Sequence, residues 1–306
     1  MRPSISGQAL RLFALCLAAI ALLASVFLAA CQGGDVKEGE TPRVKVVASL
    51  AIFADFVRQV GGDRVDVSAL IPAGADPHTY ELPPGRVVRL TEADLVIVNG
   101  LGLEAALQDV IAENTPSSTP VIELSQGLSV ITSDHESANP HLWLDVQNAI
   151  AYVERIRDAL VQIDPAGADA YRSNADSYLS ELRALDQEVV AAIDSIPSDR
   201  RKLVTFHDAF PYLAQRYGLQ LVGVVVASPG KEPSAKDVAD LVKAIAAEDV
   251  PAVFEEPQFN ARILELAADD AGVEVCTLYS DALDKKVDTY VKLMSFNAKE
   301  LVRCLG

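Results

Sequence analysis

Short apolar segments alternate with amphipathic ones along most of this chain, from residue 43 to the C-terminus. Apolar or alternating runs of about four to eight residues are typical of strands, whereas apolar positions three and four residues apart are typical of helices. The strand-like segments are RVKVVAS, VDVSAL and LVIVNG in the first half and KLVTF, LQLVGVVV, PAVFEE and VEVCTLY in the second. Because strands that alternate with helices form parallel sheets covered on both faces, we expect an α/β fold.

The segments between these strands have the apolar spacing of helices. SLAIFADFVRQVGG predicts a helix that is capped by Ser49 and ends at Gly61 and Gly62, and GLEAALQDVIAEN predicts another over residues 102–114. In the second half, HDAFPYLAQRYG predicts a helix that begins at His207, and KKVDTYVKLMSFNAKELVRC predicts a closing helix. Since both halves alternate strands with helices, we expect two lobes of the same architecture, each a mainly parallel sheet flanked by helices.

One helical segment, residues 164–197, is much longer than the others. Its apolar positions recur at spacings of three, four and seven residues: Tyr171, Tyr178, Leu182, Leu185 and Val189. A helix of about 30 residues spans roughly 45 Å, which suits a rigid link between an N-terminal lobe (residues 43–163) and a C-terminal lobe (residues 198–306). A long surface helix of a single domain is the alternative.

The first 30 residues have the pattern of an export signal. Arg2 and Arg11 are followed by the apolar run LFALCLAAIALLASVFLAA, and no acidic residue precedes Cys31. The ending LAAC resembles the lipobox of bacterial lipoproteins, in which the chain is cut before the cysteine and the cysteine is lipidated. We therefore expect a signal peptide over residues 1–30, a lipid on Cys31 and a flexible tether over residues 31–42. A permanent membrane helix is the alternative, because the run is near the lower limit of about 18 to 20 residues for spanning.

The net charge of the chain limits the kinds of partner that it can bind. The formal charge is −17, from 43 acidic and 26 basic residues, so we expect no binding of nucleic acid through a general basic patch.

Cys276 and Cys304 lie in the predicted C-terminal lobe and are not part of a CxxC motif. In an exported protein two such cysteines are expected to form a disulfide. Two buried free thiols are the alternative.

Three of the four histidines fall at predicted strand ends or in loops that precede helices. His78 lies in DPHTYE, His141 in ANPHLWLD and His207 directly after KLVTF, while Asp281 follows the last strand in LYSDAL. Ligands of open α/β sheets bind outside the carboxyl ends of the strands, so these side chains can converge on one point. Imidazole and carboxylate groups both bind zinc. The sequence therefore predicts a metal site formed by His78, His141, His207 and Asp281.

Taken alone, each of these residues is better explained as a turn residue, a helix cap or a hydrogen-bonded histidine, and the metal hypothesis depends on the set. Asp76 and Asp208, next to two of the histidines, are interpreted as turn or cap residues. His135 lies in the polar segment ITSDHESANPH. We interpret it as an exposed loop residue, and the alternative is an accessory residue that passes metal to His141.

These motifs together resemble the zinc- and manganese-binding solute-binding lipoproteins of bacterial ABC transporters. The resemblance is carried by LAAC, DPHTYE, NPHLWLD, TFHDAFPYLAQRYGL, VFEEPQFN and LYSDAL, and it covers essentially the whole mature chain. In that family two α/β lobes are joined by a rigid helix and the metal lies between them. The resemblance implies that the first lobe supplies His78 and His141 and that the second supplies His207 and Asp281.

The resemblance also implies a function. We expect a monomeric receptor, not an enzyme, which captures a divalent metal outside the cytoplasmic membrane and delivers it to a permease driven by a cytoplasmic ATPase. It would be anchored to the cell membrane by its lipid and face the periplasm or the cell exterior. Zinc is the expected metal, because three imidazoles and a carboxylate form a tetrahedral zinc shell and manganese-selective relatives commonly have a carboxylate in place of His207. Manganese, or both ions, is the alternative, because the long histidine-rich loop of many zinc-specific members is missing.

Two other classes of protein fit parts of the pattern. His78 and Glu81 form an HxxE motif which, together with His207, resembles the zinc ligands of metallocarboxypeptidases. Catalytic zinc keeps one position open for water, however, whereas four protein ligands close the shell. A surface adhesin that uses the metal only for structure, with a role in cell adhesion, is a further alternative. The sequence has no GxSxG, P-loop or GxGxxG motif that would indicate a nucleophilic or nucleotide-binding enzyme.

Overall fold

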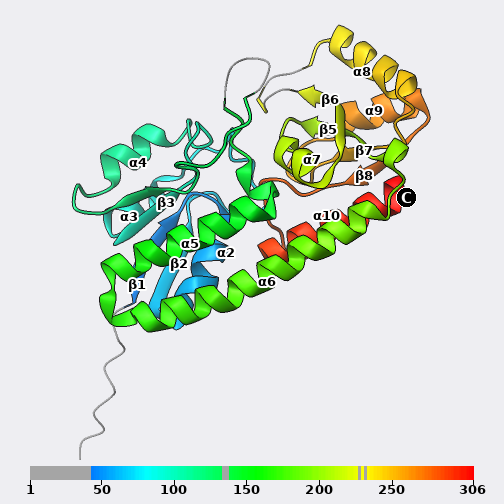
Figure 1. Cartoon of the computed structure of the whole chain (residues 1–306). Coiled ribbons are helices and arrows are strands. Elements are labelled where there is room, and N and C mark those ends of the chain that lie inside the picture. The colour runs from blue at the N-terminus through cyan, green and yellow to red at the C-terminus, as the bar shows by residue number, and fades with distance from the viewer. Residues whose placement is uncertain (1–42, 133–137, 227–228, 231–232) are drawn as a thin grey trace, which may run out of the picture. The chain divides into compact units, whose positions relative to one another are not determined.

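The structure is a computed structural model that describes residues 43–132, 138–226, 229–230 and 233–306. Residues 43–306 form one compact unit, which contains two separate four-stranded sheets with helices packed against them (Figure 1). The expected α/β fold class is therefore confirmed. The signal peptide, the tether, Cys31 and His135 all lie outside the described residues.

The first sheet has the strand order β2-β1-β3-β4, and all its neighbouring strands are parallel. Its central strands are apolar because both faces are covered, and every residue of β3 is buried. The strands are β1 (Val44–Ala48), β2 (Val65–Ala69), β3 (Leu95–Val98) and β4 (Val121–Glu123). The helices of this half are α2 (Ala51–Gly61), α3 (Pro84–Thr91), α4 (Gln108–Asn114) and α5 (Val146–Ile163).

Two predicted helix starts in this half are wrong. Ser49 does not cap α2, whose N-cap residue is Leu50 with no side-chain hydrogen bond. The Ser49 hydroxyl instead donates a 2.7 Å hydrogen bond to the buried carboxylate of Glu104. Residues 102–107 form turns and α4 begins only at Gln108, because the Glu104 carboxylate also accepts hydrogen bonds from the backbone N–H groups of Asn99 and Gly100. A buried polar network thus replaces the first turns of the predicted helix.

The second sheet repeats this arrangement, with the strand order β6-β5-β7-β8 and only parallel pairs. Its strands are β5 (Lys202–His207), β6 (Gln220–Val226), β7 (Ala252–Glu255) and β8 (Glu274–Thr277). Its helices are α7 (Pro211–Tyr217), α8 (Ala235–Ala247), α9 (Arg262–Ala271) and α10 (Tyr290–Leu305). The prediction that a helix begins at His207 is wrong, because His207 is the last residue of β5 and Pro211 is the first residue of α7.

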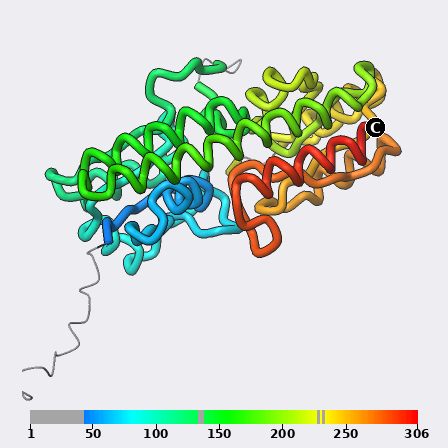
Figure 2. Tube along the Cα trace, turned by 60° about the horizontal axis from the view of Figure 1, so that its bottom comes forward, coloured from blue at the N-terminus to red at the C-terminus, as the bar shows by residue number. Residues whose placement is uncertain are grey.

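The long helix α6 (Ala168–Asp194) has 27 residues and follows α5. Its predicted apolar positions are all buried, namely Tyr171, Tyr178, Leu182, Leu185 and Val189. It packs against α2 and α5 of the first half and against α7 and α10 of the second (Figure 2). One continuous helix therefore contacts elements of both halves, while the division into lobes at residues 163/164 and 197/198 stays a prediction.

The start of α10 packs into the core of the first half. The Tyr290 ring is fully buried, and its centroid lies 4.9 Å from that of Phe56 on α2. The Tyr290 backbone N–H donates a 2.8 Å hydrogen bond to the buried carboxylate of Asp55, also on α2. Because this aromatic ring fills space between elements far apart in the sequence, the two halves share one hydrophobic core around it.

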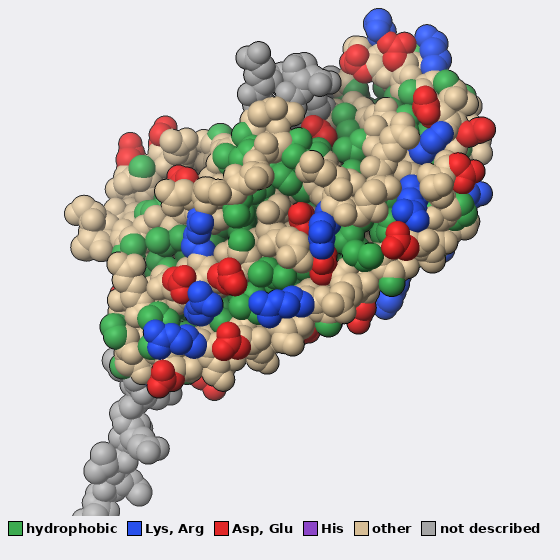
Figure 3. All heavy atoms as spheres, viewed as in Figure 1, with side chains coloured by type: hydrophobic (Ala, Val, Ile, Leu, Met, Phe, Trp, Pro, Cys, Tyr) green, Lys and Arg blue, Asp and Glu red, His purple; other side chains and the backbone are tan. Residues whose placement is uncertain are grey.

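The surface carries mixed charge. On the face shown in Figure 3, acidic and basic side chains are interspersed, and no histidine of the described residues reaches that face. Among the residues that the structure describes, none of the helices is both long and apolar enough to cross a membrane.

Candidate metal centre

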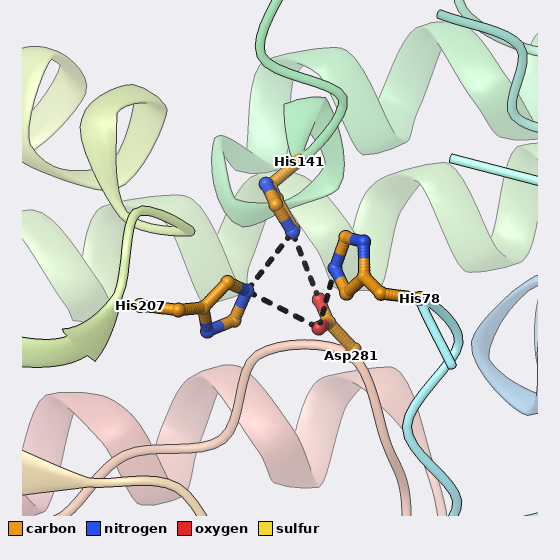
Figure 4. Close-up of side chains that lie close together, drawn as sticks. All are labelled: His78, His141, His207 and Asp281. Carbon is orange, nitrogen blue, oxygen red and sulfur yellow. Dashed lines mark hydrogen bonds and ion pairs between the residues drawn. The ribbon is translucent and has the colours of Figure 1, made fainter. Parts of the chain in front are cut away.

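The four predicted site residues point towards one another at the carboxyl ends of the two sheets (Figure 4). His78 lies in the loop after β2, His141 after β4, His207 at the end of β5 and Asp281 after β8. The Nε2 atom of His141 lies 3.2 Å from that of His207 and 3.4 Å from Asp281 Oδ1. Asp281 Oδ2 lies 3.5 Å from His78 Nε2 and 3.4 Å from His207 Nε2. Side chains separated by more than 200 residues thus enclose a single point.

The loop that presents His78 is held by its own short-range hydrogen bonds. One carboxylate oxygen of Asp76 accepts a 2.9 Å hydrogen bond from the backbone N–H of His78, and the other accepts one from the Thr79 hydroxyl. This is an Asx turn, so Asp76 has the local turn role predicted for it. The fixed φ of Pro77 further restricts the loop. His78 is therefore largely ordered before any ligand binds, which lowers the entropic cost of binding.

Asn139 orients His141. Its side-chain oxygen lies 3.0 Å from His141 Nδ1 and accepts a 3.1 Å hydrogen bond from the His141 backbone N–H. With Nδ1–H donating to this oxygen, Nε2 is the nitrogen that carries the lone pair, and Nε2 points into the centre. Asn139 also donates to the backbone carbonyl of Asp208, just after β5, at 2.7 Å. One amide thus aligns the imidazole and joins the loops of both halves.

Glu256 has the same relation to His207. Its Oε1 atom lies 2.7 Å from His207 Nδ1 and accepts a 3.1 Å hydrogen bond from the His207 backbone N–H. The Nε2 atom of His207 is therefore the one that faces the centre. A carboxylate that accepts from the outer nitrogen of an imidazole fixes its tautomer and makes the inner nitrogen a stronger ligand.

Burial and charge set the protonation of the centre. The side chains of Asp281, His207 and His141 are 0%, 1% and 3% exposed, whereas that of His78 is 15% exposed. Burial lowers the pKa of His141 well below its usual value despite the nearby Asp281 carboxylate. Burial also disfavours the charged forms of His207 and Asp281. At both residues, however, the attraction between opposite charges outweighs this effect of burial. The pKa of His207 is raised to about 10 by Glu256 and Asp281, and that of Asp281 is held well below its usual value by His141 and His207.

The four residues fit a divalent transition metal. His78 Nε2 and both oxygens of Asp281 are buried without a hydrogen-bond partner, which is costly unless a cation binds them. Zinc bonds of about 2.0–2.2 Å in a tetrahedral shell put neighbouring ligand atoms about 3.3–3.6 Å apart. The separations of 3.2–3.5 Å between nitrogen and oxygen atoms of the cluster are close to this spacing. A metal at this point would give the unpaired His78 nitrogen and the Asp281 carboxylate a partner.

Other residues singled out in the sequence lie apart from this cluster. Glu81, the second residue of the HxxE motif, is exposed and is not among the clustered ligand atoms. Cys276 of β8 and Cys304 near the end of α10 form a disulfide, which joins the closing helix to the second sheet. The sequence alone predicts no role for Asn139 or Glu256, although both lie within the motifs ANPHLWLD and VFEEPQFN. The only hints in the sequence are that Asn139 lies two residues before His141 and that Glu256 lies at the end of a predicted strand.

The fold and the site together define a substrate-binding receptor of an ABC transporter, of the class that binds metal ions. The chain belongs to the family described as zinc-uptake complex component A, periplasmic, which it matches over residues 46–304. This family consists of receptors and not enzymes, so the interpretation of HxxE as a hydrolase motif is wrong.

Named relatives and solved structures agree with this class. The chain is 32% identical to the manganese-binding lipoprotein MntA of Halalkalibacterium halodurans, over 95% of this chain and 98% of MntA. It is similar to the periplasmic zinc-binding protein TroA of Treponema pallidum, with a TM-score of 0.82, 29% identity and coverage of 86% and 99%. It is also similar to the manganese-bound periplasmic metal-binding protein of Candidatus Liberibacter asiaticus, with a TM-score of 0.79, 26% identity and coverage of 86% and 100%. The relatives are thus named for different metals.

Proposed function

We propose that this protein is an extracytoplasmic receptor that binds one zinc ion through His78, His141, His207 and Asp281 and delivers it to an ABC permease. The observation that carries the proposal is the convergence of three imidazole Nε2 atoms and one carboxylate on a buried point. The acceptors at this point need a cation, and no group of the cluster is left to act as a catalyst. Binding followed by release, without chemistry on the ion, is the function that this arrangement supports.

The donor set favours zinc over manganese. Three nitrogens and one carboxylate suit zinc, which accepts tetrahedral shells of mixed nitrogen and oxygen ligands. The affinity order of divalent metals at a given nitrogen and oxygen site also places zinc above manganese. The family description and the name of the Treponema relative are consistent with this choice.

Manganese is the second candidate, and one observation specifically favours it. Both oxygens of Asp281 face the centre, Oδ1 towards His141 and Oδ2 towards His78 and His207. A bidentate carboxylate would raise the number of donor atoms from four to five, and manganese suits oxygen ligands and higher coordination numbers. The names of the relatives MntA and the manganese-bound protein are consistent with this alternative.

Elemental analysis of protein purified without added metal tests the choice, followed by competition titration of zinc against manganese. We expect zinc to be found and to displace manganese. Alanine variants of the four ligands should each lose most of the zinc affinity, while Glu81→Ala, an exposed matched control from the same loop, should bind as the wild type does. Tighter binding of manganese would reject zinc, and unchanged binding in all four ligand variants would reject the site.

The proposed location follows from the N-terminal residues and is tested separately. We expect the precursor to be cleaved before Cys31 and lipidated there, so that the monomeric receptor is anchored outside the cytoplasmic membrane beside its permease. Cys31→Ala should leave an uncleaved or mislocalised precursor, and normal lipid labelling of this variant would contradict the assignment. If metal uptake is the role, zinc salts should rescue the growth of a deletion strain. An adhesin that uses the metal only for structure would show no such rescue.

A further inference from the structure

Glu256 lies between the two ligands of the second half. The sheet order β6-β5-β7-β8 places β7 between β5, which ends at His207, and β8, which leads to Asp281. Glu256 is the residue directly after β7, and it is 1% exposed. The topology therefore puts one buried carboxylate beside the two strand ends that carry ligands, although its own side chain is not among the clustered ligand atoms.

The two oxygens of Glu256 divide their contacts between these strand ends. Oε1 accepts from both the backbone N–H and the Nδ1–H of His207, at 3.1 and 2.7 Å. Oε2 accepts from the hydroxyl of Ser280, the residue before Asp281, and from the Gln258 side-chain amide at 3.3 Å. The same amide nitrogen lies 2.7 Å from Ser280 Oγ. All these donors are N–H or O–H groups, which is the environment of an ionised carboxylate that only accepts.

The charge of this carboxylate changes the charge balance of the buried centre. A divalent ion bound by three neutral imidazoles and the Asp281 carboxylate leaves one uncompensated positive charge. Burying a net charge is expensive in a protein interior. The Glu256 carboxylate, hydrogen-bonded to the ligand His207, supplies the second negative charge, so that a divalent ion makes the centre neutral.

We propose that Glu256 is a positioning and charge-balancing residue that aligns His207 and the Asp281 loop and makes the site selective for divalent over monovalent cations. The inference rests on the proposed function and extends it to a residue that does not touch the metal. The first sheet has a comparable contact. Asn99, directly after the middle strand β3, donates a 2.9 Å hydrogen bond to the carbonyl of Pro140, the residue before His141. Asn99 is neutral, so this contact of the first sheet positions the loop of His141 without adding a charge.

The test compares Glu256→Gln with Glu255→Gln, a matched control that removes the same charge one residue earlier, where the side chain contacts Thr277 instead of the centre. Zinc and silver(I) affinities are measured by competition with chelating indicators. Glu256→Gln should weaken zinc binding about ten- to a hundred-fold, and it should shift the preference towards silver(I), because a monovalent ion then gives the neutral centre. Ser280→Ala, which cuts the link but keeps the charge, should weaken zinc binding without this shift.

The outcomes separate the inference from the proposed function. Zinc affinity within about two-fold of the wild type in Glu256→Gln, while His207→Ala loses binding, overturns the inference and leaves the function intact. An equal loss for zinc and silver(I) overturns the charge-balancing role. If Glu256→Gln fails to fold, Glu256→Asp replaces it: the shorter carboxylate should weaken zinc binding about ten-fold and keep the wild-type preference, and unchanged affinity would overturn the positioning role. Wild-type zinc binding in the alanine variants of all four ligands would instead reject the proposed function.

Discussion

The indole Nε1–H of Trp143 donates a 2.9 Å hydrogen bond to the backbone carbonyl of Ser280. Trp143 lies two residues after His141, and Ser280 directly precedes Asp281. Trp143 is the only tryptophan of the chain and is fully buried, and its own carbonyl accepts a 2.7 Å hydrogen bond from the Tyr290 hydroxyl. A single side chain therefore joins the segments that carry two of the four proposed ligands.

Trp143→Phe should weaken both the fold and the site. The smaller ring leaves a cavity, and the Ser280 carbonyl loses its donor, so we expect the free energy of unfolding to fall by about 1–3 kcal/mol. Zinc affinity should fall as well, because the Asp281 loop is no longer held against the His141 segment. Denaturant unfolding and zinc titration measure the two effects. Unchanged zinc affinity in a folded variant would show that this hydrogen bond does not support the site.

Metal binding should change the fluorescence of Trp143. Its ring centroid lies 5.4 Å from that of His141, so a cation bound at His141 alters the field around the indole. Because the chain has no second tryptophan, the whole indole signal belongs to this position. Titrating zinc into metal-free protein should shift the emission with the same midpoint as a competition assay. The His141→Ala variant should not respond, and a response there would assign the signal to another event.

Zinc binding should weaken in acid. Protons compete with the metal for the three imidazole nitrogens, so affinity is expected to fall steadily below the ordinary histidine pKa of about 6.5. The raised pKa of His207, about 10, extends this competition above pH 6.5, because a proton must leave that ring when the metal binds, so a weaker pH dependence is expected between pH 8 and pH 6.5 as well. Competition titrations from pH 8 to pH 5 measure the effect. Constant affinity across this range would be incompatible with a site of three histidines.

His207→Glu should reduce the preference for zinc over manganese. The substitution replaces a nitrogen donor by a carboxylate, and carboxylate oxygens suit manganese better than imidazole does. The new side chain would also lie near the Glu256 carboxylate. We therefore expect weaker binding of both metals, together with a smaller difference between the zinc and manganese affinities. The ratio of the two dissociation constants is the quantity to measure. A ratio equal to or larger than that of the wild type would contradict the role assigned to His207.

Asp186→Asn should destabilise the protein at neutral pH but much less in acid. Asp186 of α6 accepts hydrogen bonds from Arg216, Tyr217 and Gln147. Burial alone would raise its pKa, but these donors lower the pKa below its usual value. Its stabilising contribution is therefore present above the unfolded-state pKa of about 3.9 and is lost as the pH falls through the lower folded-state pKa.

At pH 7 the expected loss for Asp186→Asn is about 1–3 kcal/mol in the free energy of unfolding, and the difference from the wild type should shrink below about pH 4. Asp176→Asn, an exposed carboxylate on the same helix, is the matched control and should change little at either pH. If the stability difference between Asp186→Asn and the wild type stayed the same in acid, the stabilising role of the ionised Asp186 carboxylate would be contradicted. Zinc affinity should stay near the wild-type value, which distinguishes this variant from Trp143→Phe.

Most elements of the fold could be predicted because their apolar patterns are long or uninterrupted. The periodic residues of α6 and the apolar strand β3 are clear examples. The three-residue strand β4 was not predicted, because VIE is too short to show a pattern and two of its residues are exposed. The error at Ser49 has a different cause. A serine before an apolar run is a typical N-cap, but here Glu104, 55 positions later, accepts its hydroxyl hydrogen.

The four clustered residues could be proposed from the sequence because strand ends of parallel sheets meet at one edge. The supporting residues could not. Asn139 precedes a proline, which makes it look like an ordinary turn residue, and Glu256 lies beside a second glutamate with nothing to distinguish the two. Only the pairing of β7 with its neighbours decides that Glu256 faces His207 and that Glu255 faces Thr277.

The burial of Tyr290 against Phe56 and Asp55 has a consequence for how the chain folds. A residue close to the C-terminus completes the packing of a helix that begins at residue 51, so residues 43–163 do not contain all of their own core. Contacts so distant in sequence form slowly, and they cannot form until nearly the whole chain is available. Folding and unfolding of residues 43–306 are therefore expected to be one cooperative transition, and a chain that ends before α10 should not retain a folded first half.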